Sequence, residues 1–340
     1  MKPLLNSLSF ASLALTMCWA TIARGDDTIA SLYAEAVKEG KVVVWSPLEV
    51  TLQEKMAVAF ARRYPGIIVE AFRIQPGPAI ERAVTERNAG RTTVDIIDPN
   101  VSYLPLLFER GLVEPYPWAK VFGIPPEQLM FDSRAIVICE YDYPISFNTN
   151  LVQPGELKSW NDLLNPRWRG KIAVEARGLQ FSILSQKWGE APTISFVKNL
   201  LNQKPILTKG ATPAAEALAS GQVAVAVGPM GSRMTQFHEE GGPVEWARVG
   251  PIPALVVTIV PIRGGPHPNA ARLWAAFWAT EEAQKIFYDD GRYGMLTTGT
   301  INPRGAQVRE AGAEVIRETT DIVEGQRLLE LFGKMISGIP

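Results

Sequence analysis

The sequence predicts an α/β protein of two lobes joined by extended segments. Apolar strands alternate with amphipathic helices, this alternation occurs in two blocks, and long extended runs separate the blocks. The chain has 340 residues, which is too long for one small domain and suits two lobes of ordinary size. Apolar residues make up 46% of the chain and charged residues 20%, so we expect a packed core rather than disorder.

The N-terminus has the pattern of a secretory signal. Lys2 supplies a positive charge, a mostly apolar stretch covers residues 4–20, and small residues follow at Thr21 and Ala23. The stretch is short and interrupted by polar residues, which disfavours a membrane anchor. We therefore expect a cleaved signal peptide over residues 1–25 and export of the mature chain.

The two cysteines predict a mature chain without an internal disulfide. Cys18 falls in the signal segment, and Met17 is a poor match to the small residue that precedes a lipidated cysteine, so lipid attachment is disfavoured. Only Cys139 remains after cleavage, within an apolar run, and we expect it to be a buried small hydrophobe. No further apolar run is long enough to span a bilayer, which predicts a soluble mature protein.

The first block has the spacing of a βαβαβ unit. Its strands are expected at 41–45, 67–73 and 94–98, and its helices at 29–39, 51–64 and 79–89. Gly40, the pair Pro65-Gly66 and Gly90 end these helices. Thr51 is the expected N-cap of the second helix, with Glu54 as its capping-box partner. The spacing predicts a parallel sheet with helices on both faces.

The second block follows an extended run at 134–148. Its strands are expected at 172–174 and 223–227, and its helices at 160–164, 180–187, 195–201 and 213–220. A second extended run at 254–261 precedes helices at 269–279 and 281–289, and a last helix is expected at 321–336.

The two extended runs predict a hinge, and a cleft between lobes is a common place for a small ligand. We expect lobe 1 to comprise residues 26–140 and about 258–340, and lobe 2 to comprise residues 141–257.

Composition and motifs disfavour several classes of function. The sequence contains no HExxH zinc motif, no G-x-S-x-G nucleophile motif and no phosphate-binding Gly-Lys loop. Its two histidines, His238 and His267, lie in a polar stretch and between prolines. The formal net charge of -1 argues against a nucleic-acid binder, which carries a basic excess. We expect no enzymatic activity, no cofactor, no bound metal and no nucleic-acid partner.

Candidate ligand contacts follow from a rule for parallel sheets, in which ligands sit beyond the C-terminal ends of the strands. In the first lobe the rule selects Ser46, Leu48, Glu49, Arg73, Gly77 and Asp98, and in the second lobe Arg177, Gly178, Thr212, Gly228 and Arg233. Tyr143 is a further candidate at the first crossing, although Tyr141 and Tyr143 also suit ordinary hinge aromatics.

Two kinds of hydrogen-bond donor occur among these candidates. They are the helix starts at Gly77, Gly178 and Thr212 and the guanidinium groups of Arg73, Arg177 and Arg233. Helix N-termini expose unpaired N–H groups, and guanidinium binds carboxylate or phosphonate in bidentate fashion. Together they predict a small anionic or zwitterionic solute. The alternative is that the arginines pair with nearby acids such as Glu175 or point to water.

Five stretches, taken in order, resemble the periplasmic solute-binding proteins of ABC importers, in the group that includes ferric-iron binders. They are KVVVWSPLE with AFARRYPGIIVEAFR, ERNAGRTTVDIID, ISFNTNLV with SWNDLLNPRWRGKIAV, AAEALASGQVAVAV, and IRGGPHPNAARLWAAFWATEEAQKIFYDDGRYG. The resemblance spans most of residues 41–294. It implies the two-lobe type II periplasmic-binding fold, a periplasmic location, a small-molecule solute and a transient partner in an inner-membrane ABC permease. We expect a monomer.

Iron remains an alternative ligand. Ferric-binding relatives use phenolate oxygens, often from adjacent tyrosines, because a hard cation prefers hard oxygen ligands. Their tyrosine pair follows the strand that matches residues 223–227, where this chain reads GPMGSRM. Glu49 can match an early ligand of those relatives, but one carboxylate does not make a site. Two alternatives of other classes stay open, a secreted two-lobe α/β enzyme and a sensory ligand-binding subunit.

Overall fold

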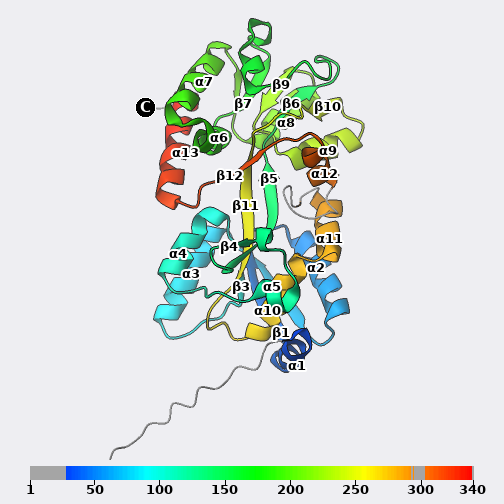
Figure 1. Ribbon diagram of the computed structural model, residues 1–340, viewed down its shortest axis with the longest axis vertical. Helices are drawn as coiled ribbons and strands as arrows, with labels where there is room; N and C mark the ends of the chain where they lie inside the picture. Colours follow the sequence, from blue (N-terminus) through cyan, green and yellow to red (C-terminus); the bar gives the residue numbers. More distant parts are fainter. Residues whose placement is uncertain (1–27, 292–293, 295–302, 339–340) are drawn as a thin grey trace, which may run out of the picture.

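Two helix-covered sheets make up the protein, joined by long strands that run between them (Figure 1). The computed structural model describes residues 28–291, 294 and 303–338. The predicted signal peptide, with Cys18, lies outside these residues. The α/β class with two lobes is confirmed.

The first lobe is built on a mixed sheet with the strand order β2-β1-β3-β11-β5-β4. Its strands are β1 (Lys41–Ser46), β2 (Ile68–Arg73), β3 (Ile96–Ile97), β4 (Leu129–Met130), β5 (Ala135–Asp142) and β11 (Ile252–Pro261). Its helices are α1 (Ile29–Glu39), α2 (Val50–Arg63), α3 (Pro76–Asn88), α4 (Leu104–Glu109), α5 (Trp118–Phe122), α10 (Pro268–Trp278) and α11 (Glu281–Gly291), with 3₁₀ turns η1 (Val101–Tyr103) and η2 (Pro126–Gln128).

Alternation along the strands of the first sheet supplies a core on each face. In β1, Val42 and Val44 pack with α1, α2 and α10, while Val43 and Trp45 pack with α3 and α4. This is the burial expected of a strand that is apolar on both sides. The strands β1, β2 and β3 run parallel, so their C-terminal ends meet at one edge of the sheet, facing the second lobe.

The second lobe is built on a five-stranded sheet with the order β10-β6-β9-β7-β8. Its strands are β6 (Ile145–Asn148), β7 (Ile172–Glu175), β8 (Ile206–Thr208), β9 (Val225–Val227) and β10 (Val244–Trp246). Its helices are α6 (Leu179–Trp188), α7 (Glu190–Asn202), α8 (Ala211–Ala219) and α9 (Gly231–Glu239), with 3₁₀ turns η3 (Trp160–Leu164) and η4 (Pro166–Trp168). The strands β7, β8 and β9 run parallel and end toward the first lobe.

The hinge contains the two crossings that the sequence predicts, together with a short strand that it does not predict. The strands β5 and β11 pair antiparallel, with a register shift between Val257 and Thr258. A short strand, β12 (Val315–Arg317), pairs parallel with the start of β11 on its other side. The chain lies on the second lobe both before β12, in helix α12 (Pro303–Glu310), and after it, in helix α13 (Ile322–Ser337), so this strand widens the hinge without adding a crossing.

The C-terminal segment lies on the second lobe, contrary to the expected return of residues 258–340 to the first. Only α10 and α11 return. Helix α12 (Pro303–Glu310) lies near α9, and α13 (Ile322–Ser337) packs along α6 (Figure 1). Hydrophobic packing explains this position, because Leu328, Phe332 and Ile336 form one face of α13 and complete the core around β7 and β9.

Among the described residues, every helix is too short or too polar to cross a bilayer. Cys139 is a free thiol, fully buried in β5, as its apolar surroundings predict.

Candidate functional site

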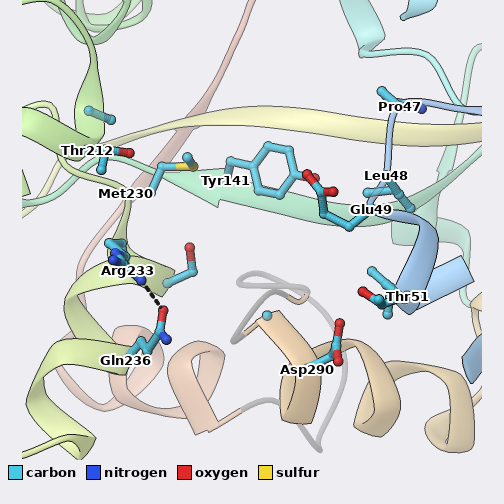
Figure 2. A pocket seen from close by; sticks show the side chains of 14 residues that line it. Pro47, Leu48, Glu49, Thr51, Tyr141, Thr212, Met230, Arg233, Gln236 and Asp290 are labelled. Carbon is cyan, nitrogen blue, oxygen red and sulfur yellow. Dashed lines mark hydrogen bonds between the residues drawn. The ribbon is translucent and has the colours of Figure 1, made fainter. Parts of the chain in front are cut away.

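A cavity of about 440 Å³ opens between the lobes beside the hinge (Figure 2). Its first-lobe wall consists of the start of α2 and the end of α11, and its second-lobe wall consists of the starts of α8 and α9. Tyr141, near the end of β5, lies between the two walls (Figure 2). The volume falls within the range of small-molecule sites, which is about 300–1,000 Å³.

Three helix N-termini open onto this cavity, and within the described part of the chain none of them carries a side-chain cap. The N-cap residues of α2, α8 and α9 are Glu49, Gly210 and Met230, and no side chain of these three residues accepts a capping hydrogen bond. The expected capping box of Thr51 and Glu54 is therefore wrong, because the N-cap is Glu49, two residues earlier, and Thr51 lies within the first turn of α2. Uncapped N-termini offer free backbone N–H groups and partial positive charge.

Both carboxylates on the first-lobe wall have a cationic partner. Glu49 Oε1 accepts a hydrogen bond from Arg73 Nη2 at 2.6 Å. Asp290 pairs with Lys55, which lies on α2. Each pair is close to neutral, so these acids do not make the cavity strongly negative.

The cationic group on the opposite wall has no carboxylate partner among the described residues. Arg233 Nη1 donates to the neutral Gln236 Oε1 at 2.6 Å, and its guanidinium lies 4.3 Å from the ring centre of Phe237. Its Nε is buried and donates no hydrogen bond within the described residues. The second-lobe wall thus carries an uncompensated positive charge beside the starts of α8 and α9.

The structure brings four of the twelve predicted residues into the cavity wall: Leu48, Glu49, Thr212 and Arg233. Arg73 lies next to them through its ion pair with Glu49. The other seven lie outside the wall, and they are Ser46, Gly77, Asp98, Tyr143, Arg177, Gly178 and Gly228.

Burial and pairing explain why several strand-end residues stay outside the cavity. Ser46 and Asp98 are buried beneath the cleft, and burial raises the pKa of Asp98 to about 7, an effect that the Ser46 hydroxyl only partly opposes. Tyr143 is also buried, which raises the pKa of its phenol above the ordinary value. Arg177 Nε pairs with Glu175 Oε1 at 2.7 Å, so the alternative pairing that the sequence suggested is the one observed.

The three glycines among the residues outside the wall lie close to neighbouring segments of the chain. A Cβ on Gly228 would lie 2.3 Å from Glu175 Cβ, and one on Gly178 would lie 2.8 Å from the Phe332 backbone. Gly77 stands in the first turn of α3, beside the Tyr103 ring. These glycines let neighbouring segments approach closely.

Ten residues of the cavity wall were not among the twelve sequence candidates, and they include Tyr141, Met230, Gln236 and Asp290. Met230 and Gln236 flank Arg233 at intervals of three residues, so helical periodicity from that arginine would have found them. Tyr141 was set aside as a hinge aromatic. Asp290 reaches the site from α11, and nothing in its local sequence signals this.

Metal-binding side chains do not cluster in the described part of the chain. No group of three or more His, Cys, Asp or Glu residues there is arranged to hold an ion.

Comparison with known proteins places the chain in a family. The sequence matches the bacterial extracellular solute-binding protein family over residues 41–293. The search of curated proteins found no match to this sequence.

Solved structures with the same fold share little sequence with this chain. FutA (IdiA) of Trichodesmium, in complex with iron and citrate, has a TM-score of 0.69 at 16% identity, covering 88% of this chain and 99% of that one. Iron-bound HitA of Pseudomonas aeruginosa has a TM-score of 0.68 at 18% identity, covering 86% and 99%. A protein described as a GABA receptor has a TM-score of 0.66 at 17% identity, covering 87% and 96%.

These likenesses show the two-lobe type II fold. The family match extends over most of the chain and ends just beyond α11. The chain therefore belongs to the bacterial extracellular solute-binding protein family.

Proposed function

We propose that the protein binds a small anionic or zwitterionic solute in the 440 Å³ cavity and hands it to an inner-membrane permease. The observation that carries this proposal is the convergence of three uncapped helix N-termini on one cavity between the lobes. An anion there would accept hydrogen bonds from backbone N–H groups that no side chain of the described residues caps, and it would gain from the positive ends of three helix dipoles.

Arg233 supports the same ligand class. Its charge is not balanced by a carboxylate among the described residues, so an incoming carboxylate or phosphonate would supply the missing partner. Tyr141 lies between the two walls, and its ring and phenol oxygen suit the cationic end of a zwitterion. The GABA receptor shares the fold, and GABA is itself a small zwitterion.

Iron is the second candidate, since Glu49, Tyr141 and Asp290 bring three oxygen donors to the cavity and two relatives of the same fold bind iron. The ion pairs of Glu49 with Arg73 and of Asp290 with Lys55 weigh against it. A cation would have to displace both partners before these carboxylates could ligate it.

We further propose the cellular setting and the lobe boundaries. Residues 1–25 would direct export to the periplasm and be removed there. The lobes would then comprise residues 26–140 with about 258–291, and residues 141–257 with 303–338. A ligand that contacts both walls favours the closed form, because only that form gains both sets of contacts.

A thermal-shift screen of the mature chain tests the ligand class. The panel contains phosphonates, organic acids, polyamines, thiamine-like compounds and ferric complexes. We expect stabilisation by members of the first two groups, zwitterionic acids among them, and none from polyamines, because mass action raises the unfolding temperature only for ligands of the native state. Stabilisation by ferric complexes alone would favour the iron alternative.

Substitution of Arg233 tests the site. For an anionic hit of the screen, Arg233→Ala should weaken binding by roughly 10- to 100-fold, the effect of one charge-assisted hydrogen-bonding group. Arg134→Ala is the matched control, since Arg134 also stacks on a phenyl ring, that of Phe108, but does not line the cavity. Calorimetric titration of both variants measures the change. Equal affinities of the wild type and the Arg233 variant would remove this residue from the site.

A further inference from the structure

The C-terminal segment reaches the rear of the ligand cavity, although it lies beyond the part of the chain that matches the family. Helix α12 stands beside α9 and the end of β5 (Figure 1). Its second residue, Arg304, is only 2% exposed. A buried arginine at the end of the hinge calls for an explanation, because a charge is rarely buried without a specific partner.

Arg304 is held between a carboxylate and an aromatic ring. Its Nε donates to Asp142 Oδ2 at 3.0 Å, and its Nη2 donates to the same oxygen. Its guanidinium carbon lies 4.0 Å from the ring centre of Trp246, on β10. Arg304 thus connects the last residue of the hinge strand β5 to the edge strand of the second sheet.

Asp142 in turn lies against the first residue of α9. A Cβ on Gly231 would stand 2.3 Å from Asp142 Oδ2 and 2.4 Å from Oδ1, so only glycine leaves room for this carboxylate. Met230 and Ser232, on either side of Gly231, line the ligand cavity. The carboxylate therefore sits directly behind the helix N-terminus that we assign to the solute.

An unneutralised carboxylate at this place would compete with the ligand. It would itself occupy the positive end of the α9 dipole, and it would repel an anion bound on the other side of the same turn. Arg304 balances that charge, and its contact with Trp246 holds the guanidinium against β10.

We propose that Arg304 is a positioning residue for solute binding: by neutralising Asp142 and fixing it against Gly231, it keeps the start of α9 available to an anion in the cavity. The inference rests on the proposed anionic ligand and adds that the C-terminal segment sets the strength of anion binding.

Charge-changing variants of the full mature chain separate this role from a purely structural one. The probes are succinate and methylphosphonate, titrated by calorimetry. Arg304→Met should weaken binding of both roughly tenfold, because a bare carboxylate remains behind α9. Asp142→Asn should instead strengthen binding several-fold, because Arg304 then adds positive charge. The double variant, which removes both charges, should bind within about threefold of wild type. A purely structural role would weaken binding in all three variants, and that result would overturn the inference.

Arg317→Met is the matched control. Arg317 also comes from the C-terminal segment and also pairs with a buried carboxylate of β5, since its Nε lies 2.7 Å from Glu140 Oε1, but neither residue lines the cavity. Its loss should lower the unfolding temperature and leave the affinity for both probes within about threefold of wild type. A tenfold weakening equal to that of Arg304→Met would contradict a specific role of Arg304.

A readout without ligand covers variants that fold poorly and probes that fail to bind. Arg304→Lys keeps the charge and loses the fork of two hydrogen bonds, so amide hydrogen exchange at residues 231–236 should rise in it and in the double variant, but not in Arg317→Met. Unchanged exchange there in both variants would overturn the inference. If the wild type binds neither probe, the proposed function fails for these anions, while the exchange comparison still decides whether Arg304 holds α9.

Discussion

At the residue scale, close backbone contacts at a few glycines hold the architecture together. Gly178 has a φ of +74° at the start of α6, and the backbone of Phe332 and Gly333 on α13 lies where its Cβ would be. This one residue thus needs the left-handed conformation and also the absence of a side chain. The contact lets α13 lie against α6 and bury Phe332 in the second core.

Replacing this glycine should loosen the C-terminal helix. Gly178→Ala should lower the free energy of unfolding by about 3 kcal/mol, the sum of the cost of a positive φ and of overpacking against α13. Gly90→Ala is the matched control, because Gly90 has the same φ of +74° and nothing within 4 Å of its Cβ position. It should cost only about 1 kcal/mol. Denaturant unfolding measures both, and equal losses would show that the contact with α13 contributes nothing.

A second residue-scale effect is the buried carboxyl of Asp98. The side chain is fully buried at the end of β3 and has no cationic partner among the described residues, and burial raises its pKa from 3.8 to about 7. A raised pKa in the folded state means that the protonated form is favoured there. The protonated carboxyl therefore contributes to the free energy of unfolding. This contribution is fully present below about pH 4, where the unfolded chain is also protonated, and is lost as the pH rises to about 7.

Asp98→Asn should therefore remove a pH dependence. The free energy of unfolding of wild type minus that of the variant should fall by on the order of 3 kcal/mol between pH 4 and pH 7 and stay level above. Chemical denaturation at several pH values gives this difference directly, and other titrating groups cancel in it. Glu318, whose pKa burial also raises to about 7, remains in both proteins and serves as an internal reference. A difference that does not change with pH would show that Asp98 ionises normally in the folded protein.

At the scale of elements, the sequence predicted those whose pattern is local. The apolar run KVVVW and the two extended crossings were found close to their observed bounds, because strands buried on both faces are continuously apolar. The strand β12 and helix α12 were missed. The strand is only three residues long and all three are half-buried, so its position depends on pairing with β11 rather than on its own sequence.

The candidate site was likewise predicted where the signal is local and missed where it depends on contacts between distant segments. The rule for strand ends found Leu48, Glu49 and Arg233 because parallel strands carry their following loops to one edge. It also selected Arg177 and Asp98, which are paired or buried, since sequence does not tell which strand-end side chains turn away from the cleft. Arg304 could not have been found, because its partner Asp142 lies 162 positions earlier in the chain.

At the scale of the whole molecule, two cavities lie between the lobes, and each is lined by residues of both. The ligand cavity lies between α2 and α11 on one side and α8 and α9 on the other. A smaller cavity of about 180 Å³ lies between η1 of the first lobe and α6 and α13 of the second. Helices α6 and α13 lie on the opposite side of the hinge strands from α9 and α11 (Figure 1). Rotation that closes one side must widen the other, so the lobes can rock about β5, β11 and β12 without breaking their cores.

Ligand binding should therefore both compact the protein and raise its free energy of unfolding. At a ligand concentration of 100 times the dissociation constant, mass action adds about 2.7 kcal/mol to the free energy of unfolding, which raises the unfolding temperature by about 4 °C. Small-angle scattering of the same samples should show a smaller radius of gyration, because closure brings the two walls of the cavity together. Arg233→Ala at that same concentration should show both changes only in part, since less of it is bound. Superimposable scattering curves for the ligand-saturated and ligand-free wild type, alongside a rise in unfolding temperature, would mean that the cleft binds solute without closing.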